Sequence, residues 1–395
     1  MIQLGRHEVH HGDCVAWMNG LPEDSVDAVV CDPPYGLVFM GKEFDALGEG
    51  RAMQAWHASW LVAALRVLKP GGHLVAFSHG RTFHRLWCAA EDVGLEIRDT
   101  LFWCQGQGFP KSQDTSKAID KAAGAERRIV GPPTRHAGQS YKWADTNNHP
   151  THSEDKAART APATTLAKLY DGYGTALKPS YEPILLARKP LSGSMVKNVQ
   201  AHGTGPLDLN GCRIATEEAL KGPTVRCDIR GGNFGNGHKA AEDVPAFQQS
   251  SLGRWPTNLL MDETMASMLD DESDAKPSRF FPVLPVDDPD LPNLFYTGKI
   301  VNAERAGTSH PTPKPLAVMR WLVRLVSPPD RDGVPALVVD PFLGSGTTLI
   351  ACEAEGKRCA GAEQDDAYIG MIRARYAARE AIVASCDART KRKTK

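Results

Sequence analysis

Two stretches of this chain decide the fold that it can adopt: Asp32-Pro33-Pro34-Tyr35 and Asp340-Pro341-Phe342-Leu343-Gly344-Ser345-Gly346-Thr347. Each follows a short apolar run, residues 26–31 before the first and residues 336–339 before the second, and such runs predict buried strands. Because α/β sheets bind ligands at the carboxyl ends of their strands, we expect both stretches at that edge of one shared sheet.

Strands and helices alternate on either side of these stretches. Near the start, the pattern predicts a helix, a Lys-Pro-Gly-Gly stop, a strand, a helix and a strand over residues 52–68, 69–72, 73–77, 82–93 and 96–104. Near the end, it predicts helices over 316–326, 347–355 and 366–384, with strands over 336–339 and 358–362. This alternation is typical of a mostly parallel, twisted sheet with helices on both faces.

Composition narrows the class of protein. The 395 residues are 42% hydrophobic and 24% charged, and no apolar run is long enough to cross a membrane. The nine cysteines form no Cys-x-x-Cys pair, so we expect neither a disulfide framework nor a metal site. The first residues do not resemble a secretion signal, which favours a cytoplasmic protein.

Charge is segregated along a chain of net charge −1. Residues 105–200 hold 14 Lys and Arg against 8 Asp and Glu, whereas residues 261–295 hold 2 against 9. The basic part is interleaved with tyrosines and a tryptophan, a pattern that suits phosphate contact and stacking on bases. A solvated loop is the alternative interpretation, and the acidic part is expected to face away from any polyanion.

The glycine turn at 344–346 is expected to bind a small ligand. It has no Gly-Lys-Ser/Thr and so is not a Walker A phosphate loop, and it does not match Gly-x-Gly-x-x-Gly. Glu363 ends the next strand about twenty residues later, where an acidic side chain can accept hydrogen bonds from ribose hydroxyls. The pairing favours a nucleoside cofactor without a diphosphate, although such a turn can also simply end a strand and begin a helix.

The chain resembles the S-adenosylmethionine-dependent DNA methyltransferases that modify amino groups. Phe342-x-Gly344-x-Gly346 resembles their cofactor motif, Asp32-Pro33-Pro34-Tyr35 their catalytic motif, and His310-Pro311-Thr312-Pro313-Lys314-Pro315 their tenth motif. Gly12-Asp13-Cys14 and Pro179-Ser180-Tyr181-Glu182-Pro183-Ile184 also match. The catalytic motif precedes the cofactor motif, as in the circularly permuted beta group. The resemblance implies a Rossmann-like fold interrupted by a large irregular insertion.

The resemblance also implies roles for individual residues. Glu363 would hold the ribose of S-adenosylmethionine, Asp13 and Cys14 would lie near its adenine, and the turn would line its methionine part. Asp13 could instead be a simple turn residue, and Lys314 could contact the cofactor or cap a helix. The complete expected cofactor set is Asp13, Cys14, Lys314, Asp340, Phe342, Gly344, Ser345, Gly346, Thr347, Thr348 and Glu363.

The expected catalytic residues are Asp32, Pro33, Pro34 and Tyr35. An exocyclic amino group is a poor nucleophile, because its lone pair is delocalised into the ring. The Asp32 carboxylate and the Pro33 carbonyl could each accept one N–H and direct the lone pair towards the methyl group. Tyr35 would stack on a base swung out of the duplex. The tetrapeptide alone could instead be a strand-ending turn.

The base that is modified follows less directly from the sequence. Both adenine N6 and cytosine N4 offer two N–H bonds to the same acceptors, and Asp at the first motif position is more typical of adenine enzymes in the family. Methylation at a ring carbon would need a Pro-Cys thiolate, and the chain contains no Pro-Cys. We therefore expect a site-specific adenine-N6 methyltransferase of the restriction-modification type.

The domain division expected from these motifs has six parts. Residues 1–104 and 310–384 are the two halves of the catalytic domain, and 179–190 add a strand to it; 105–178 form a target-recognition insertion, 191–309 a second, partly irregular insertion, and 385–395 a basic tail. The expected partner is double-stranded DNA, contacted through Lys117, Arg127, Arg128, Arg135 and Lys142. A homodimer and a partner restriction nuclease are left open.

Three other functions remain open from the sequence. The first is cytosine-N4 methylation of DNA, and the second is methylation of RNA or of a protein amide. Protein-amide enzymes resembling this family usually carry Asn where Asp32 stands, and they lack so large an insertion. The third is a catalytically silent DNA-binding module that keeps the fold, against which the intact Asp32, Phe342 and Glu363 argue.

Overall fold

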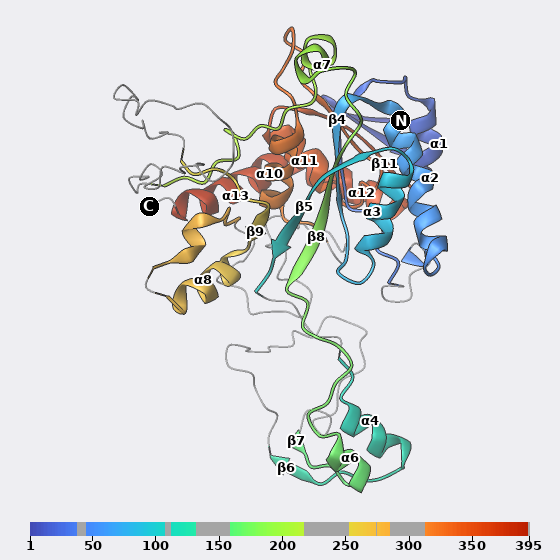
Figure 1. The fold of residues 1–395 in the computed structure, drawn as a ribbon, viewed down its shortest axis with the longest axis vertical. Coiled ribbons are helices and arrows are strands. Elements are labelled where there is room, and N and C mark those ends of the chain that lie inside the picture. The colour runs from blue at the N-terminus through green and yellow to red at the C-terminus, as the bar shows by residue number, and fades with distance from the viewer. Residues whose placement is uncertain are drawn as a thin grey trace, which may run out of the picture.

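A mixed sheet forms the centre of the protein (Figure 1). The computed structural model describes residues 1–37, 45–106, 112–131, 159–216, 253–273, 275–284 and 313–393. Within these residues the sheet has nine strands, in the order β1 (Ile2–Leu4), β2 (His7–His11), β11 (Arg358–Glu363), β10 (Leu337–Asp340), β3 (Val26–Cys31), β4 (Leu68–Phe77), β8 (Tyr181–Arg188), β5 (Glu96–Cys104) and β9 (Leu259–Met261).

The middle of the sheet is parallel, as the alternating pattern predicted. Strands β2, β11, β10, β3 and β4 run in one direction, whereas β8 is antiparallel to both β4 and β5. Every residue of β3 is buried, which explains why this strand is apolar on both faces except at Asp27, whose carboxylate pairs with Lys69. Ala28 and Val30 pack on one face of the sheet, and Val29 and Cys31 on the other.

Helices cover both faces of the sheet, as expected for a Rossmann-like α/β fold (Figure 1). The face with Val29 and Cys31 packs against α1 (Cys14–Gly20), α2 (Arg51–Val67) and α3 (Phe83–Asp92). The face with Ala28 and Val30 packs against α10 (Leu316–Val326), α11 (Thr347–Ala354), α12 (Asp366–Ala377) and α13 (Arg379–Lys393). The blocks before and after the insertions therefore fold into one layered body, in the permuted order that the sequence predicted.

Three details differ from the sequence-based expectations. Residues 69–72 do not simply end a helix, because β4 already begins at Leu68 and includes them. The helix expected over 366–384 is divided at Ala378 into α12 and α13. The expected basic tail is helical as far as Lys393, the last residue of α13.

The second insertion contributes to the main body. It contains α7 (Met195–His202), β9, α8 (Glu263–Asp271) and the short 3-10 helix η3 (Pro277–Phe280). Strand β9 pairs in parallel with β5 and forms that edge of the sheet. A three-residue strand gives almost no sequence periodicity, so its place in the sheet depends on its partner rather than on its own pattern.

The first insertion forms a small, separate body below the sheet in Figure 1. This subdomain contains α4 (Thr115–Ala122), the two-stranded sheet of β6 (Ile129–Gly131) and β7 (Arg159–Thr160), and α6 (Thr165–Leu169). The chain enters and leaves it along adjoining segments, because Asp114 forms a β-bridge with Gly174 and the Thr115 N–H donates to the Tyr173 carbonyl at 3.0 Å.

Among the described helices, none combines the length and apolarity needed to cross a membrane.

Candidate active site

Strand pairing brings the two motifs together. Strands β3 and β10 are parallel neighbours, with Val29 opposite Val339. Because parallel neighbours end at the same edge of a sheet, the loop that begins at Asp32 and the turn that follows Asp340 lie side by side. The expectation that these distant stretches meet is confirmed.

Two more strands deliver residues to the same edge. Strand β11 pairs with β2 so that Glu363 lies opposite His11, and the Gly12 N–H donates to the Glu363 carbonyl at 2.9 Å. Asp13 follows at once and begins α1, where its carboxylate accepts the Ala16 N–H at 2.8 Å. Asp13 therefore caps α1, a role that the sequence analysis did not assign to it, and follows directly on the Gly12 that is bonded to Glu363.

The Asp32 carboxylate lies at the centre of a compact polar cluster. Its Oδ1 accepts the Tyr35 hydroxyl at 2.8 Å, and its Oδ2 accepts a hydrogen bond from the Lys314 ammonium. The two oxygens of a carboxylate offer about four acceptor positions, so two further hydrogen bonds can still be accepted. The Asp32 side chain is 26% exposed, which leaves it accessible from the edge of the sheet.

Lys314 is nearly buried, and its ammonium contacts acids rather than capping a helix. The residue is 5% exposed, and its Nζ lies 3.5 Å from Glu182 Oε2 as well as against Asp32. The ring centres of Phe77 and Tyr35 lie 4.9 and 5.3 Å from the same nitrogen. Of the two roles that the sequence left open for Lys314, helix capping is therefore not the one observed, since Pro315 precedes α10 without a side-chain cap.

Glu182 is a member of the cluster that the sequence analysis gave no role. It lies in β8, is 6% exposed, and accepts hydrogen bonds from the Tyr35 hydroxyl at 3.1 Å and from Gln105 Nε2 at 3.0 Å. The sequence could have pointed to Glu182, because it is a carboxylate near the start of a mostly apolar strand, and buried carboxylates need partners. Which partners it has depends on β8 lying between β4 and β5.

The tetrapeptide loop is fixed at its far side by a second buried acid. Asp45 accepts the N–H groups of Gly36 and Leu37 at 2.7 and 3.0 Å. Burial, together with the adjacent Asp32 carboxylate, raises the pKa of the Tyr35 hydroxyl well above its usual value. Tyr35 therefore stays protonated and acts as a hydrogen-bond donor to Asp32.

The glycine turn has the backbone geometry that its sequence predicted. Gly344 and Gly346 adopt φ values of 53° and 80°, in the left-handed region that favours glycine. The Gly344 N–H donates to Glu363 Oε2 at 2.8 Å, and the Asp365 N–H donates to Oε1, also at 2.8 Å. Burial raises the pKa of Glu363 above its ordinary value. The turn and the acid that follows it form one unit.

The polar side chains of the turn face into the protein. Arg375, which is 1% exposed, donates from Nη1 to the Ser345 carbonyl, the Ser345 hydroxyl and the Thr347 hydroxyl at 2.7, 2.8 and 3.0 Å. Thr348 donates its hydroxyl to Asp340 Oδ2 at 2.5 Å, and the Phe342 N–H donates to Oδ1 at 2.9 Å. In this structure, these hydroxyls stabilise the turn from behind.

Aromatic rings line the other side of the turn. Phe342 packs against Trp56 and Trp60 of α2, with ring centres 5.8 and 5.3 Å apart. Cys14 lies nearby at the start of α1, and burial raises the pKa of its thiol to about 12, so it stays neutral. A nucleoside with an uncharged base fits these residues. Glu363 can still accept hydrogen bonds from hydroxyls, and Phe342 and Cys14 offer apolar surface.

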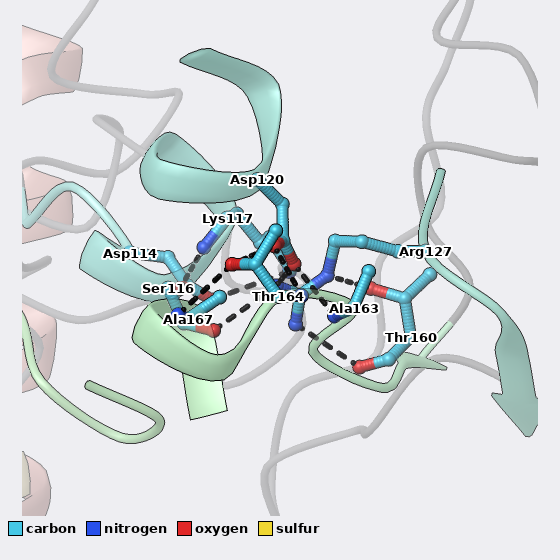
Figure 2. Close-up of polar contacts among 9 residues, drawn as sticks. All are labelled: Asp114, Ser116, Lys117, Asp120, Arg127, Thr160, Ala163, Thr164 and Ala167. Atoms are coloured by element: carbon cyan, nitrogen blue, oxygen red, sulfur yellow. Dashed lines mark hydrogen bonds and ion pairs between the residues drawn. The ribbon is translucent and has the colours of Figure 1, made fainter. Parts of the chain in front are cut away.

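The residues expected to bind DNA divide into three kinds. Lys117 and Arg128 are exposed on the subdomain, and Lys117 Nζ lies 3.5 Å from Asp114. Arg127, by contrast, is an internal residue, 11% exposed, and donates to Asp120, Ser116 and Thr160 (Figure 2). Its guanidinium is used inside the subdomain, which corrects the expectation of a phosphate contact. Arg135 and Lys142 lie outside the described residues.

Asp120 is the acceptor that holds this subdomain together (Figure 2). It is fully buried and also accepts the N–H groups of Ala163 and Thr164 at 2.9 and 3.0 Å, and the Thr164 hydroxyl at 2.8 Å. Burial alone would raise the pKa of Asp120, but these hydrogen bonds lower it to about 2.

Among the described residues, no cluster of His, Cys, Asp and Glu could hold a metal ion.

The fold and this edge together define a class of protein: Rossmann-like α/β proteins with an accessible carboxylate beside a glycine turn at one edge of the sheet. The family model described as DNA methylase, for N6 and N4 amino methylation, matches residues 26–374. The chain therefore belongs to this family of DNA amino-methyltransferases. S-adenosyl-L-methionine is the methyl donor of the family, which agrees with the cofactor expected from the sequence.

Individual relatives are more distant. The type II methyltransferase M.BamHI of Bacillus amyloliquefaciens is 31% identical over 75 residues, which span 18% of this chain and 17% of that protein. A Thermus thermophilus protein assigned as a DNA modification methylase is 18% identical over 94% of each chain, with a TM-score of 0.41. The cytosine-N4-specific PvuII DNA methyltransferase is 14% identical over 95% of this chain and 90% of its own, with a TM-score of 0.45.

Proposed function

We propose that this protein transfers a methyl group from S-adenosyl-L-methionine to the N6 amino group of adenine in duplex DNA. The single observation that carries the proposal is the pairing of β3 with β10, which puts the Asp32 carboxylate beside the turn tied to Glu363. A nucleophile held at Asp32 and a cofactor held at Glu363 would then be neighbours.

In the proposed complex, residues of the glycine turn and of the neighbouring strand ends each bind a different part of the cofactor. Glu363 accepts the ribose hydroxyls, Asp13 and Cys14 lie beside the adenine, and Phe342 with Gly344 bounds the methionine part. Asp340, Ser345, Thr347 and Thr348 contribute by fixing the turn, which follows from their bonds to one another and to Arg375. When bound, the cofactor supplies a methyl group activated by a positively charged sulfur.

The proposed chemistry belongs to Asp32 and Pro33. One N–H of the target amino group donates to a free acceptor position on Asp32, and the other donates to the Pro33 carbonyl, which the proline ring holds in place. Both bonds pull the nitrogen lone pair out of conjugation. The nitrogen would lose a proton on accepting the methyl group that a bound cofactor would supply, and the Asp32 carboxylate is placed to take that proton.

Tyr35 and the subdomain serve DNA binding in this proposal. The target base must leave the stack to reach Asp32, and the Tyr35 ring, whose hydroxyl is fixed by Asp32 and Glu182, offers it an aromatic surface. Lys117 and Arg128 are exposed on the subdomain and are proposed to contact phosphates, with Arg135 and Lys142 retained from the sequence.

Product analysis tests the proposal directly. The purified protein is incubated with duplex DNA and tritiated S-adenosyl-L-methionine, and the DNA is digested to nucleosides. Tritium in N6-methyladenine is the expected result. Tritium in N4-methylcytosine would refute the assignment of the base but keep the chemistry, whereas unlabelled DNA would refute the proposed function.

A further inference from the structure

A buried lysine between two carboxylates is an unusual feature beside a catalytic acid. The Lys314 ammonium pairs with Asp32 and lies 3.5 Å from Glu182 Oε2. The side chains of Lys314 and Glu182 are 5% and 7% exposed, against 26% for Asp32. Two ionised groups are therefore removed from water to support a third that remains accessible.

The burial of these charges needs compensation. Removing an ion from water is costly unless it is paired and hydrogen-bonded, and a lone buried lysine would tend to lose its proton. Two carboxylates beside one ammonium leave a local charge of −1, which favours the charged lysine. Phe77 and Tyr35 present their rings to the same nitrogen and exclude water from it.

Each member of the cluster is fixed by a different part of the fold. Asp32 follows β3, Glu182 belongs to β8, and Lys314 stands between Pro313 and Pro315 just before α10. Glu182 is held at both oxygens, by Tyr35 and by Gln105. The single hydroxyl proton of Tyr35 has two acceptors, Asp32 at 2.8 Å and Glu182 at 3.1 Å. The two acids are thus coupled through Tyr35 as well as through Lys314.

We propose that Lys314 and Glu182 are positioning residues for Asp32, and that Lys314 is not a cofactor ligand. Lys314 donates to the Asp32 carboxylate and aims it along the sheet edge. Glu182 pairs with the same ammonium group and so weakens the interaction between Lys314 and Asp32. The Asp32 carboxylate can then still accept an N–H of the substrate. This inference rests on the proposed function, since it concerns the same catalytic acid.

The two residues act on Asp32 with opposite sign. A neighbouring cation favours the ionised form of a carboxylate, and a neighbouring anion disfavours it. Other groups face Asp32 and stay unchanged in every variant: Tyr35 in its own loop, Cys31 at the end of β3, and Asp340 at the end of β10. A shift in the pH dependence can therefore be assigned to the residue that was replaced.

The experiment measures single-turnover methylation against pH for Lys314→Met, Lys314→Arg and Glu182→Gln. For Lys314→Met, we expect the rate to fall about tenfold to a hundredfold and its acidic limb to move up by about one pH unit. For Glu182→Gln, the acidic limb moves to lower pH. Lys314→Arg keeps the cation and retains the acidic limb of the unmodified protein.

Affinity for S-adenosyl-L-methionine, measured by calorimetry, separates this proposal from a cofactor contact. Binding is expected to stay within about twofold in all three variants, because the cluster contacts Asp32 rather than Glu363. Lys357→Met is the matched control, because it removes a lysine paired with Asp330 at the opposite end of β11 and should change neither rate nor affinity. A thermal melt of each variant reports folding.

The outcomes are distinct. Acidic limbs that move in opposite directions, with affinity retained, support the positioning pair. A limb that stays in place in Lys314→Met, or a loss of cofactor affinity there, would overturn it. If Lys314→Met fails to fold, the direction of the Glu182→Gln shift decides alone. An unmodified protein that methylates no DNA refutes the proposed function, and this inference with it.

Discussion

At the scale of single residues, carboxylates at one sheet edge have three different tasks. Asp32 is accessible and retains acceptor capacity, Glu363 is tied to the backbone of the turn, and Asp340 is buried behind it. All three end or follow parallel strands, yet their surroundings give them different exposure to solvent and different partners. The prediction for Asp32 therefore concerns turnover, and the prediction for Asp340 concerns the stability of the protein.

Replacing Asp32 by Ala should abolish turnover without loss of the cofactor. The methyl transfer rate is expected to fall at least about a hundredfold to a thousandfold, because one of the two acceptors proposed to redirect the nitrogen lone pair is gone. Affinity for S-adenosyl-L-methionine should be unchanged by calorimetry, since Asp32 does not touch Glu363 or its turn. Turnover that survives in Asp32→Ala would remove this residue from its proposed role.

Replacing Asp340 by Asn should change how stability depends on pH. Burial raises the pKa of Asp340 from 3.8 to about 7, so the folded protein keeps a proton there that the unfolded chain releases. The unmodified protein therefore loses stability as the pH rises from about 4 to about 7, by a few kcal/mol at most. Asn does not titrate, so urea unfolding of Asp340→Asn should show a smaller decline over this window. Parallel declines would contradict the raised pKa.

At the scale of elements, the subdomain depends on one buried acceptor. Among the described residues of the subdomain, the two short helices and the two-stranded sheet bury little apolar surface, and large apolar side chains such as Leu166 and Leu169 stay exposed. Asp120 ties α4 to the segment before α6 and to Arg127 instead. The stability of this part is therefore mainly polar.

Replacing Asp120 by Asn should loosen the subdomain alone. The amide would still accept hydrogen bonds at one atom, but its NH2 group would face the N–H groups that the carboxylate accepts. Hydrogen exchange should show protection in α4 and α6 falling about tenfold or more, with β3 and β10 unaffected. Because the hydrogen bonds lower the pKa of Asp120 to about 2, the subdomain of the unmodified protein should itself loosen as the pH falls from about 4 to about 2. Equal exchange in both proteins would refute the role of Asp120.

At the scale of the whole molecule, the catalytic body and the subdomain are joined by two adjoining segments. The Gln105 N–H donates to the Ser180 carbonyl at 2.8 Å, and the Gln113 N–H donates to the Thr175 hydroxyl at 2.9 Å. The sheet does not need the subdomain for its own hydrogen bonds. Cofactor binding and DNA binding should therefore be separable.

Excising residues 114–174 and closing the gap with a short Gly-Ser link should leave a folded catalytic body. Affinity for S-adenosyl-L-methionine is expected to be retained, while affinity for duplex DNA falls about tenfold or more, because the phosphate contacts proposed for Lys117 and Arg128 are lost. Fluorescence anisotropy with labelled DNA, at two salt concentrations, measures the change and its reduced salt dependence. Full DNA affinity after excision would place the DNA-binding surface elsewhere.

Much of the fold could be predicted from local patterns. The helix expected over 316–326 is α10, and the strand expected over 96–104 is β5, because both have strong periodicity or a clear apolar run. The short strand β9 and the division of the last helix at Ala378 could not be predicted, because they depend on neighbours rather than on their own residues. The tetrapeptide and the glycine turn were recognisable because backbone chemistry restricts their sequences.

The sequence by itself determined the two strand-end motifs, their permuted order, and the choice of a carboxylate and a glycine turn, since these are properties of consecutive residues. Only the tertiary structure decided that Lys314 pairs with Asp32, that Glu182 completes the cluster, and that Arg127 is used internally. The physical reason is that a charged side chain takes its partner from whichever elements the fold brings within hydrogen-bonding distance. Residues 32, 182 and 314 meet because β3, β4 and β8 are neighbours in the sheet and α10 packs on β3 and β4.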